Sequence, residues 1–209
     1  MDATNNCCST LFDNLSSKNP AEQEDALISA ALDNDLQVVK AIVECFNTNC
    51  DKALFYAASQ GHLQAVQLLL QRADPKANNS EAFRVACQFG MLDVVKALLP
   101  LSDPQCNNNN PLRAAASGGH TEVVRCILPF TNPKDLFSAA LLSAAFHQHW
   151  EIADMLFDVS DVQKVYANLQ RCGPGPWNNF EYEVHSRRQK TRIAEEIDGN
   201  TTVKRSKKI

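Results

Sequence analysis

A loose cluster in the C-terminal half of the sequence, His147, His149 and Cys172, carries side chains that could do nucleophilic or acid–base chemistry. A cysteine nucleophile needs an accessible thiolate and a base within hydrogen-bond reach. The three residues show no spacing typical of such a site. The sequence also contains no HExxH pattern, no glycine-rich phosphate loop and no serine elbow. We therefore expect no enzyme and no cofactor, with an unrecognised Cys/His site kept as an alternative.

Other residues offer binding chemistry instead of catalysis. Arg84 and Arg113 could form a ladder that faces an acidic partner. Phe89 and Phe146 are large apolar groups of the type favoured as interface anchors. The separation of the two arginines recurs between many other pairs of like residues in the chain. This recurrence indicates that the chain contains repeated structural elements with the same spacing.

The whole central part of the sequence repeats with a period of 29. The period holds for three glycines, three prolines and four large apolar residues: Gly61, Gly90 and Gly119; Pro75, Pro104 and Pro133; Leu54, Phe83, Leu112 and Leu141. A fixed period of this size is typical of stacked arrays, in which each unit packs only against its neighbours.

Each period predicts two short helices. Pro111 suits the first turn of a helix over 111–117, because its missing N–H would have no helical partner there. Gly119 supplies the left-handed residue that ends this helix. Apolar residues at helical spacing predict a second helix over 121–128, and Pro129 forbids its continuation. Helices this short are stable only when packed, so the predicted fold class is all-α, a solenoid of stacked helix pairs.

The copies of the unit suggest how the chain is divided. A leading copy over 27–46 has Asn34 at the glycine position, and four clear units follow over 50–157. Gln148 takes the glycine position of the last unit, so we expect a looser or rebuilt turn there. A further copy begins at residue 159 but meets GPGP at 173–176. We expect a polar flexible leader over 1–24, an array over 25–170, a Gly/Pro linker and capping segment over 171–186, and a basic disordered tail over 187–209.

The repeats resemble those of the ankyrin repeat family. The stretch NPLRAA at 110–115 is similar to the family's Thr-Pro-Leu-His-x-Ala opening, and ASQGHL at 58–63 is similar to its Ala-x-x-Gly-His-Leu stretch. The resemblance covers about residues 25–170 and implies an ankyrin-type solenoid. Since the family's usual repeat has about 33 residues, the period of 29 predicts short hairpin loops. Arg84 and Arg113 replace the family's histidine.

The resemblance implies a protein-binding scaffold or adaptor that engages one protein partner through the concave face of the array. Ankyrin arrays bind through their hairpin tips and the exposed side of the first helix of each pair. The predicted partner-binding residues are Gln60, Arg84, Gln88, Phe89, Arg113, Phe146, His147 and Trp150. The alternative is that Phe89 packs on the next unit and that the arginines cover helix ends.

Composition agrees with one soluble, elongated array, since 44% of the 209 residues are hydrophobic. No stretch approaches the roughly 18 apolar residues of a membrane span, and MDATNNCCST lacks the features of a secretory signal. There is no CxxC pair, and Cys87 and Cys126 take positions held by Ala or Met in other copies. We therefore expect reduced thiols that pack as small core residues, in a monomer without membrane contact.

Charge is distributed unevenly along the chain. Residues 187–209 carry eight Lys and Arg and three Asp and Glu, a net +5, so residues 1–186 carry −9 of the formal net −4. Phosphate contact needs a basic surface, so we expect no specific nucleic-acid binding by the array.

The basic tail offers a targeting signal. Lys204, Arg205, Lys207 and Lys208 match the short basic pattern read by nuclear import receptors, and a second basic cluster lies upstream at 187–192. A nuclear-targeted regulatory protein is therefore an alternative, and we expect a cytoplasmic or nuclear location. AEEIDGN at 194–200 is similar to the glutamate-rich export signals of effectors that intracellular bacteria deliver into host cells. This resemblance implies a further alternative, an effector that is delivered into a host cell and acts on host proteins. A solvated end without a signal is the third alternative for the tail.

Overall fold

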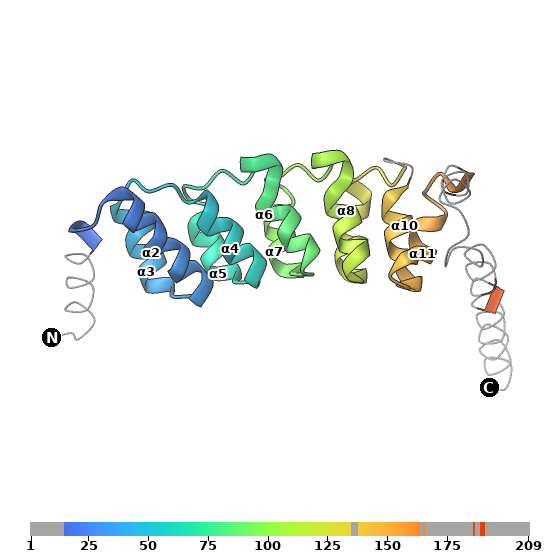
Figure 1. Cartoon of the computed structure of the whole chain (residues 1–209), viewed down its shortest axis with the longest axis horizontal. Coiled ribbons are helices and arrows are strands. Elements are labelled where there is room, and N and C mark those ends of the chain that lie inside the picture. The colour runs from blue at the N-terminus through green and yellow to red at the C-terminus, as the bar shows by residue number, and fades with distance from the viewer. Residues whose placement is uncertain (1–14, 135–137, 164, 166–185, 187–188, 191–209) are drawn as a thin grey trace, which may run out of the picture.

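The computed structural model describes residues 15–134, 138–163, 165, 186 and 189–190. The helices between residues 20 and 157 form a row of pairs stacked along one axis (Figure 1). The first helices of the pairs are α2 (Pro20–Asp33), α4 (Asp51–Gln60), α6 (Ala77–Gln88), α8 (Cys106–Gly118) and α10 (Ala139–Phe146). The second helices are α3 (Leu36–Cys45), α5 (Leu63–Leu69), α7 (Leu92–Leu98), α9 (Thr121–Ile127) and α11 (Trp150–Phe157). A short 3-10 helix, η1 (Leu128–Phe130), follows α9. The predicted all-α solenoid is confirmed.

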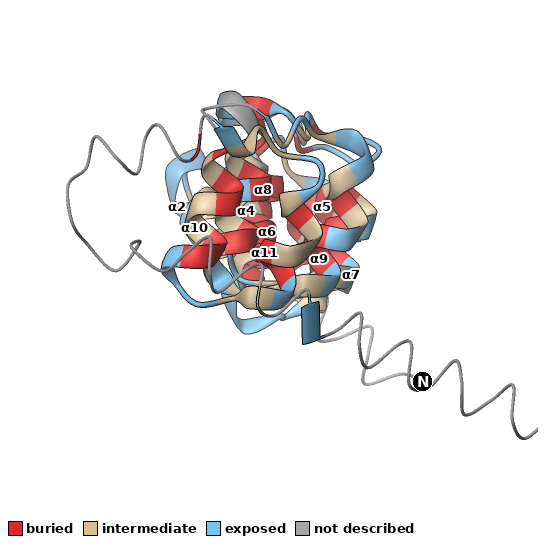
Figure 2. Ribbon diagram, turned by 90° about the vertical axis from the view of Figure 1, so that its right-hand side faces the viewer, coloured by how far each residue is buried: buried red, intermediate tan, exposed pale blue. Residues whose placement is uncertain are grey.

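The helices form two layers with the core between them. Each first helix contacts the first helix of the next pair, and the second helices contact one another in the same way. Buried residues lie where the two layers meet (Figure 2). The four apolar residues that recur with the repeat period, Leu54, Phe83, Leu112 and Leu141, are all at most 1% exposed. Small residues such as Ala57, Ala86 and Ala115 are fully buried beside them, which lets neighbouring first helices approach closely.

The turn inside each helix pair has a left-handed residue at the predicted position. Gly61, Gly90 and Gly119 have φ of 77°, 73° and 75°. Asn34 has φ of 57° in the leading copy. The expectation of a looser turn at Gln148 is wrong. Gln148 adopts φ of 61°, and its neighbour His149 donates its N–H to Ala144 O, as His120 does to Ala115 O in the preceding turn.

The array begins earlier than the predicted boundary at residue 25, because α2 starts at Pro20. Asn19 caps this helix: its side chain accepts from the Glu22 N–H, and the Glu22 carboxylate accepts from the Asn19 N–H. This reciprocal capping box, with Pro20 in the first turn, fixes the start of the helix. Part of the polar segment predicted as leader is therefore the first turn of the array.

The asparagine-rich stretches also belong to the helices, which the sequence prediction placed after them. In α6, Asn78, Asn79 and Ser80 have φ of 51°, 59° and 55°, a short left-handed segment before the right-handed helix. Asn107 in α8 has φ of 49° and Ser138 before α10 has φ of 61°. Asparagine is among the few residues other than glycine that tolerate this conformation, since its short side chain can hydrogen-bond locally. The asparagines therefore provide a left-handed entry to the first helix.

Residues at the start of the first helices also hold the loop that follows each helix pair. Asp51 Oδ1 accepts the Asp74 N–H at 2.8 Å, and Ser80 Oγ accepts the Asp103 N–H at 3.0 Å. Later in the array, Ser138 Oγ accepts the Asp161 N–H at 2.9 Å. Each such bond joins one helix pair to the loop after it, so these loops are held in the same register along the array.

Candidate functional site

The exposed side chains of the first helices form one continuous surface, here called the first-helix face. The predicted partner-binding residues Gln60, Gln88, Phe89, Phe146 and His147 are all exposed on it, in the last turn of a first helix or directly after it. The sequence placed these residues together from their positions in the repeat, and the structure brings them to the same end of neighbouring first helices.

Phe89 and Phe146 are the two most exposed aromatic side chains on this face. Phe89 is 50% exposed and Phe146 is 58% exposed. Phe89 is therefore not buried under the next repeat. Phe89 therefore retains exposed surface that a partner can contact. Phe146 is exposed as well, and its ring also makes an edge contact with the ring of His147, with 5.1 Å between the ring centroids. Large apolar groups left half in water are favoured anchors when a partner covers them.

Small residues lie between the two phenylalanines. Ser117 precedes Phe146 by one repeat period and Gly118 follows Phe89 by one, so α8 presents serine and glycine where its neighbours present phenylalanine. A Cβ on Gly118 would lie 2.5 Å from Nε2 of His120, and this histidine nitrogen is 2.9 Å from Gln88 O. The packing of His120 therefore requires glycine at position 118. The surface over α8 consequently has no large side chain at these two positions, between the two phenylalanines.

The two arginines of the predicted ladder have different environments. The Arg84 Nη2 lies 3.1 Å from Oε1 of Glu81, and the Arg84 side chain is only 26% exposed. Arg113 is exposed, and the described residues place no carboxylate within ion-pair distance of it. The predicted two-arginine ladder is thus reduced to one unpaired cation, because Arg84 is neutralised within its own helix.

Trp150 belongs to the core side of the array. It is half-buried at the start of α11, a second helix, and packs against the buried cluster. Its placement does not match the first-helix positions of the other predicted binding residues. A tryptophan at this point covers apolar surface of the last described helix pair.

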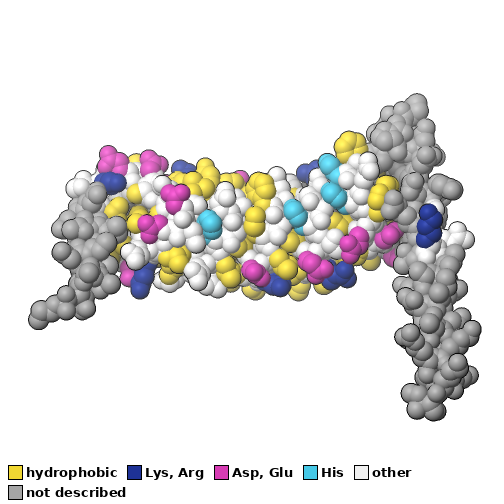
Figure 3. All heavy atoms as spheres, turned by 90° about the horizontal axis from the view of Figure 1, so that it is seen from below, with side chains coloured by type: hydrophobic (Ala, Val, Ile, Leu, Met, Phe, Trp, Pro, Cys, Tyr) yellow, Lys and Arg dark blue, Asp and Glu magenta, His cyan; other side chains and the backbone are white. Residues whose placement is uncertain are grey.

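The histidines of the turns have a structural role. Nε2 of His62 is 3.0 Å from Leu32 O, and Nε2 of His149 is 3.0 Å from Ser117 O, as His120 is bonded to Gln88 O. Each histidine thus links the start of one second helix to the end of the preceding pair's first helix. Histidine side chains accordingly recur along the underside of the array (Figure 3).

The thiols near the array core are poorly suited to nucleophilic chemistry. Burial raises the pKa of Cys87, with smaller contributions from Cys106 and Cys126, and burial raises the pKa of Cys106 to about 11. Both groups are therefore protonated near neutral pH, whereas a nucleophile must be a thiolate. Cys87 is buried as predicted, but Cys126 is only half-buried. Cys172 lies outside the described residues, and His149 is held by Ser117 O as above.

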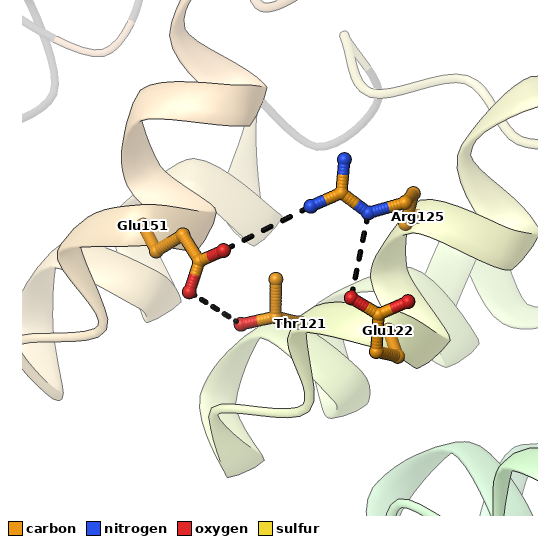
Figure 4. Close-up of polar contacts among 4 residues, drawn as sticks. All are labelled: Thr121, Glu122, Arg125 and Glu151. Carbon is orange, nitrogen blue, oxygen red and sulfur yellow. Dashed lines mark hydrogen bonds and ion pairs between the residues drawn. The ribbon is translucent and has the colours of Figure 1, made fainter.

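Some charged side chains on the second helices pair with one another. Arg125 on α9 lies 3.5 Å from Glu122 and 3.8 Å from Glu151 of α11 (Figure 4). The Thr121 hydroxyl donates to the other oxygen of Glu151 at 3.4 Å. The arginine is 59% exposed, and exposed pairs of this kind contribute at most about 1 kcal/mol. This network links two repeats on the surface opposite the first-helix face.

Charge changes along the first-helix face. Helix α2 carries four acidic residues and no basic one, whereas α4 and α6 each balance one acid with one base. Within α8 and α10, Arg113 is the only charged residue. The face therefore passes from an acidic end at α2 to an apolar, weakly basic region over α8 and α10.

Sequence reasoning missed two further exposed apolar residues on this face, Leu32 (38% exposed) and Tyr56 (36% exposed). It also missed a row in register outside the first helices, formed by Leu101, Phe130 and Val159. The repeat period was the signal that could have found this row, since each residue follows the previous one by one repeat.

Several predictions fall on residues that the structure does not describe. The basic residues Lys204, Arg205, Lys207 and Lys208 and nearly all of the segment 171–186 are among them, so the import signal and the capping segment stay predictions. Within the described ranges, no group of three or more His, Cys, Asp or Glu residues could hold a metal ion. No helix there combines the length and apolar character needed to cross a membrane.

Helix pairs in register, left-handed turns between the helices and a candidate binding surface on the first helices define a repeat solenoid of the protein-interaction class. The family model described as ankyrin repeats (3 copies) matches residues 1–79 and 83–166. The chain therefore belongs to the ankyrin repeat family, whose repeats generally serve protein–protein interaction. No curated protein matches the chain.

Proposed function

We propose that this protein is a non-enzymatic scaffold that binds one protein partner through its first-helix face. The observation that carries the proposal is the exposure of Phe89 and Phe146, at 50% and 58%, on helices that flank the small residues of α8. Each residue leaves about half of its surface in water. That surface contributes favourable free energy only when another surface covers it.

The distribution of charge favours the first-helix face as the binding surface over the surface formed by the second helices. On the second helices, Lys40 pairs with Glu44, and Arg125 pairs with Glu122 and Glu151. On the first-helix face, Arg113 has no such pair among the described residues. Interface cores are poor in charged residues and rich in aromatic residues and arginine, which is the composition found over α6, α8 and α10.

Photo-crosslinking from two sides of the same repeat tests this proposal. A photoreactive amino acid replaces Gln88, exposed on α6, or Lys96, exposed on α7, in the full chain expressed in cells that naturally contain it. We expect one dominant protein adduct from position 88 and none of that adduct from position 96, because only the first helix faces the partner. Equal adducts from both positions, or the adduct only from position 96, would refute the assignment of the face.

A further inference from the structure

We infer that the first-helix face over α6, α8 and α10 binds an extended acidic peptide segment of the partner. A central carboxylate of that segment pairs with Arg113, and large apolar side chains on either side of it contact Phe89 and Phe146. This inference rests on the proposed function and adds the chemistry of the partner.

Charge complementarity determines the charge of the partner group that contacts Arg113. Arg113 is exposed, it is the only charged residue of α8 and α10, and no described carboxylate pairs with it. Arg84 on the neighbouring helix is already paired with Glu81 at 3.1 Å. Covering Arg113 with an apolar or basic surface would leave a desolvated cation without a partner, which is strongly unfavourable. An acidic group is therefore required at this position.

One arginine fits one carboxylate. The planar guanidinium forms two parallel hydrogen bonds with a carboxylate, whereas phosphate groups are typically recognised by clusters of arginines. With Arg84 neutralised by Glu81, this part of the face has no cluster among its described residues. Residues 1–186 together carry a net −9 with Arg113 included, so an acidic segment is repelled elsewhere and directed to this part of the array.

Helix packing determines how far apart the two apolar side chains of the peptide must be. Phe89 and Phe146 lie at the ends of α6 and α10, with α8 between them. Packed helices are about 8–10 Å apart, so the two aromatic groups are separated by roughly 16–20 Å along the array. An extended chain advances about 3.3 Å per residue, which places the two apolar side chains of the peptide about six residues apart. Arg113 lies about one helical turn before Ser117, which puts the carboxylate near the middle of this stretch.

The low surface between the phenylalanines admits the backbone of such a segment. Gly118 has no side chain, and His120 excludes any larger residue there, since a Cβ would lie 2.5 Å from its Nε2. Ser117 beside it is small and half-buried. A peptide backbone can therefore approach α8 closely while its side chains reach the aromatic groups on both sides.

Selection from a displayed library of random twelve-residue peptides tests the inference. The bait is the full chain as wild type, as Arg113→Glu and as Lys96→Glu, which makes the same charge change on the second-helix side. Wild type and Lys96→Glu should enrich peptides with Asp or Glu flanked by aromatic or large aliphatic residues. Arg113→Glu should lose these peptides and enrich Lys or Arg at the central position. A synthetic peptide from the wild-type selection should bind Arg113→Glu at least tenfold more weakly, with an unchanged melting temperature of the variant.

Three results would overturn the inference. These are the absence of any enriched pattern, an enriched basic pattern on the wild type, or acidic peptides that bind Arg113→Glu as well as wild type. None of them decides the proposed function, which the crosslinks at positions 88 and 96 test separately. If position 88 crosslinks a partner while selected peptides ignore Arg113, the scaffold function stands and the acidic-peptide chemistry is wrong.

Discussion

Replacing Gly90 by alanine should lower the free energy of unfolding by about 2–5 kcal/mol, whereas Gly61→Ala should lower it by only about 1–2 kcal/mol. Both glycines have nearly the same left-handed conformation, with φ of 73° and 77°. An L-residue in that conformation costs about 1–2 kcal/mol at either position. The difference comes from the residue that the new Cβ meets in the next repeat.

At Gly90 the Cβ would lie 2.4 Å from Nδ1 of His120, whose ring is held by its bond to Gln88 O. At Gly61 it would meet the Sδ of Met91 at 2.6 Å, near the flexible end of a side chain that can move aside. Overpacking against a fixed group adds about 1–3 kcal/mol. The excess cost should therefore appear only at Gly90.

Urea denaturation of the two variants measures this difference. The combined variant Gly90→Ala with His120→Ala serves as the control, because removing the ring should reduce the cost of the Gly90 substitution to the left-handed penalty alone. Equal destabilisation at Gly61 and Gly90, or no effect of His120→Ala on the cost at Gly90, would show that His120 does not impose the requirement for glycine.

The second large effect is expected in the core. Phe83→Ala should lower the free energy of unfolding by about 3–5 kcal/mol, because Phe83 is fully buried and alanine leaves a cavity. Phe83→Leu should cost less than about 1.5 kcal/mol. Leucine is the residue that fills this repeat position at Leu54, Leu112 and Leu141, so the surrounding packing is suited to it.

Calorimetry or urea denaturation of these two variants checks the prediction. If leucine is as destabilising as alanine, the four positions are not structurally equivalent, and the repeat period does not describe the core.

The turns and the core could be predicted from sequence because they depend on local backbone conformation and on periodicity. Gly90 and Gly119 recur in register, and only glycine and a few polar residues adopt the required conformation easily. Gln148 was predicted wrongly because the bonds of His149 to Ala144 O and Ser117 O belong to the turn itself and hold it whatever the residue at 148. Tertiary hydrogen bonds, and not the residue type at 148, therefore determine the conformation of this turn.

The start of the first helices was predicted wrongly for a related reason. Asparagine runs usually indicate loops, but Asn78 and Asn79 adopt left-handed conformations that lead directly into the helix. Ser80 follows them with the same left-handed φ, and its Oγ accepts the Asp103 N–H from the connection to the next repeat. A bond between residues so far apart in the chain has no local signature in the sequence.

The difference between the two arginines was present in the sequence but was not used. Glu81 precedes Arg84 by three residues, a spacing that pairs opposite charges on a helix, whereas Asn110 takes that position before Arg113. Exposure at Phe89 and Phe146 was predicted from the repeat pattern, and the structure supports it. Trp150 was placed in the binding set although its position in the repeat belongs to a second helix.

The central claim is that a protein partner is bound by the first-helix face, and affinity measurement with matched variants tests it most directly. The partner recovered from the crosslink at position 88 is titrated against wild type, against Phe89→Ala with Phe146→Ala, and against Phe130→Ala. Phe130 is 54% exposed, as exposed as the other two, but follows a second helix. The double variant should fold normally and bind at least tenfold more weakly, a loss of about 1.4 kcal/mol or more, while Phe130→Ala binds as wild type. Normal binding by the double variant, or an equal loss in Phe130→Ala, would contradict the account.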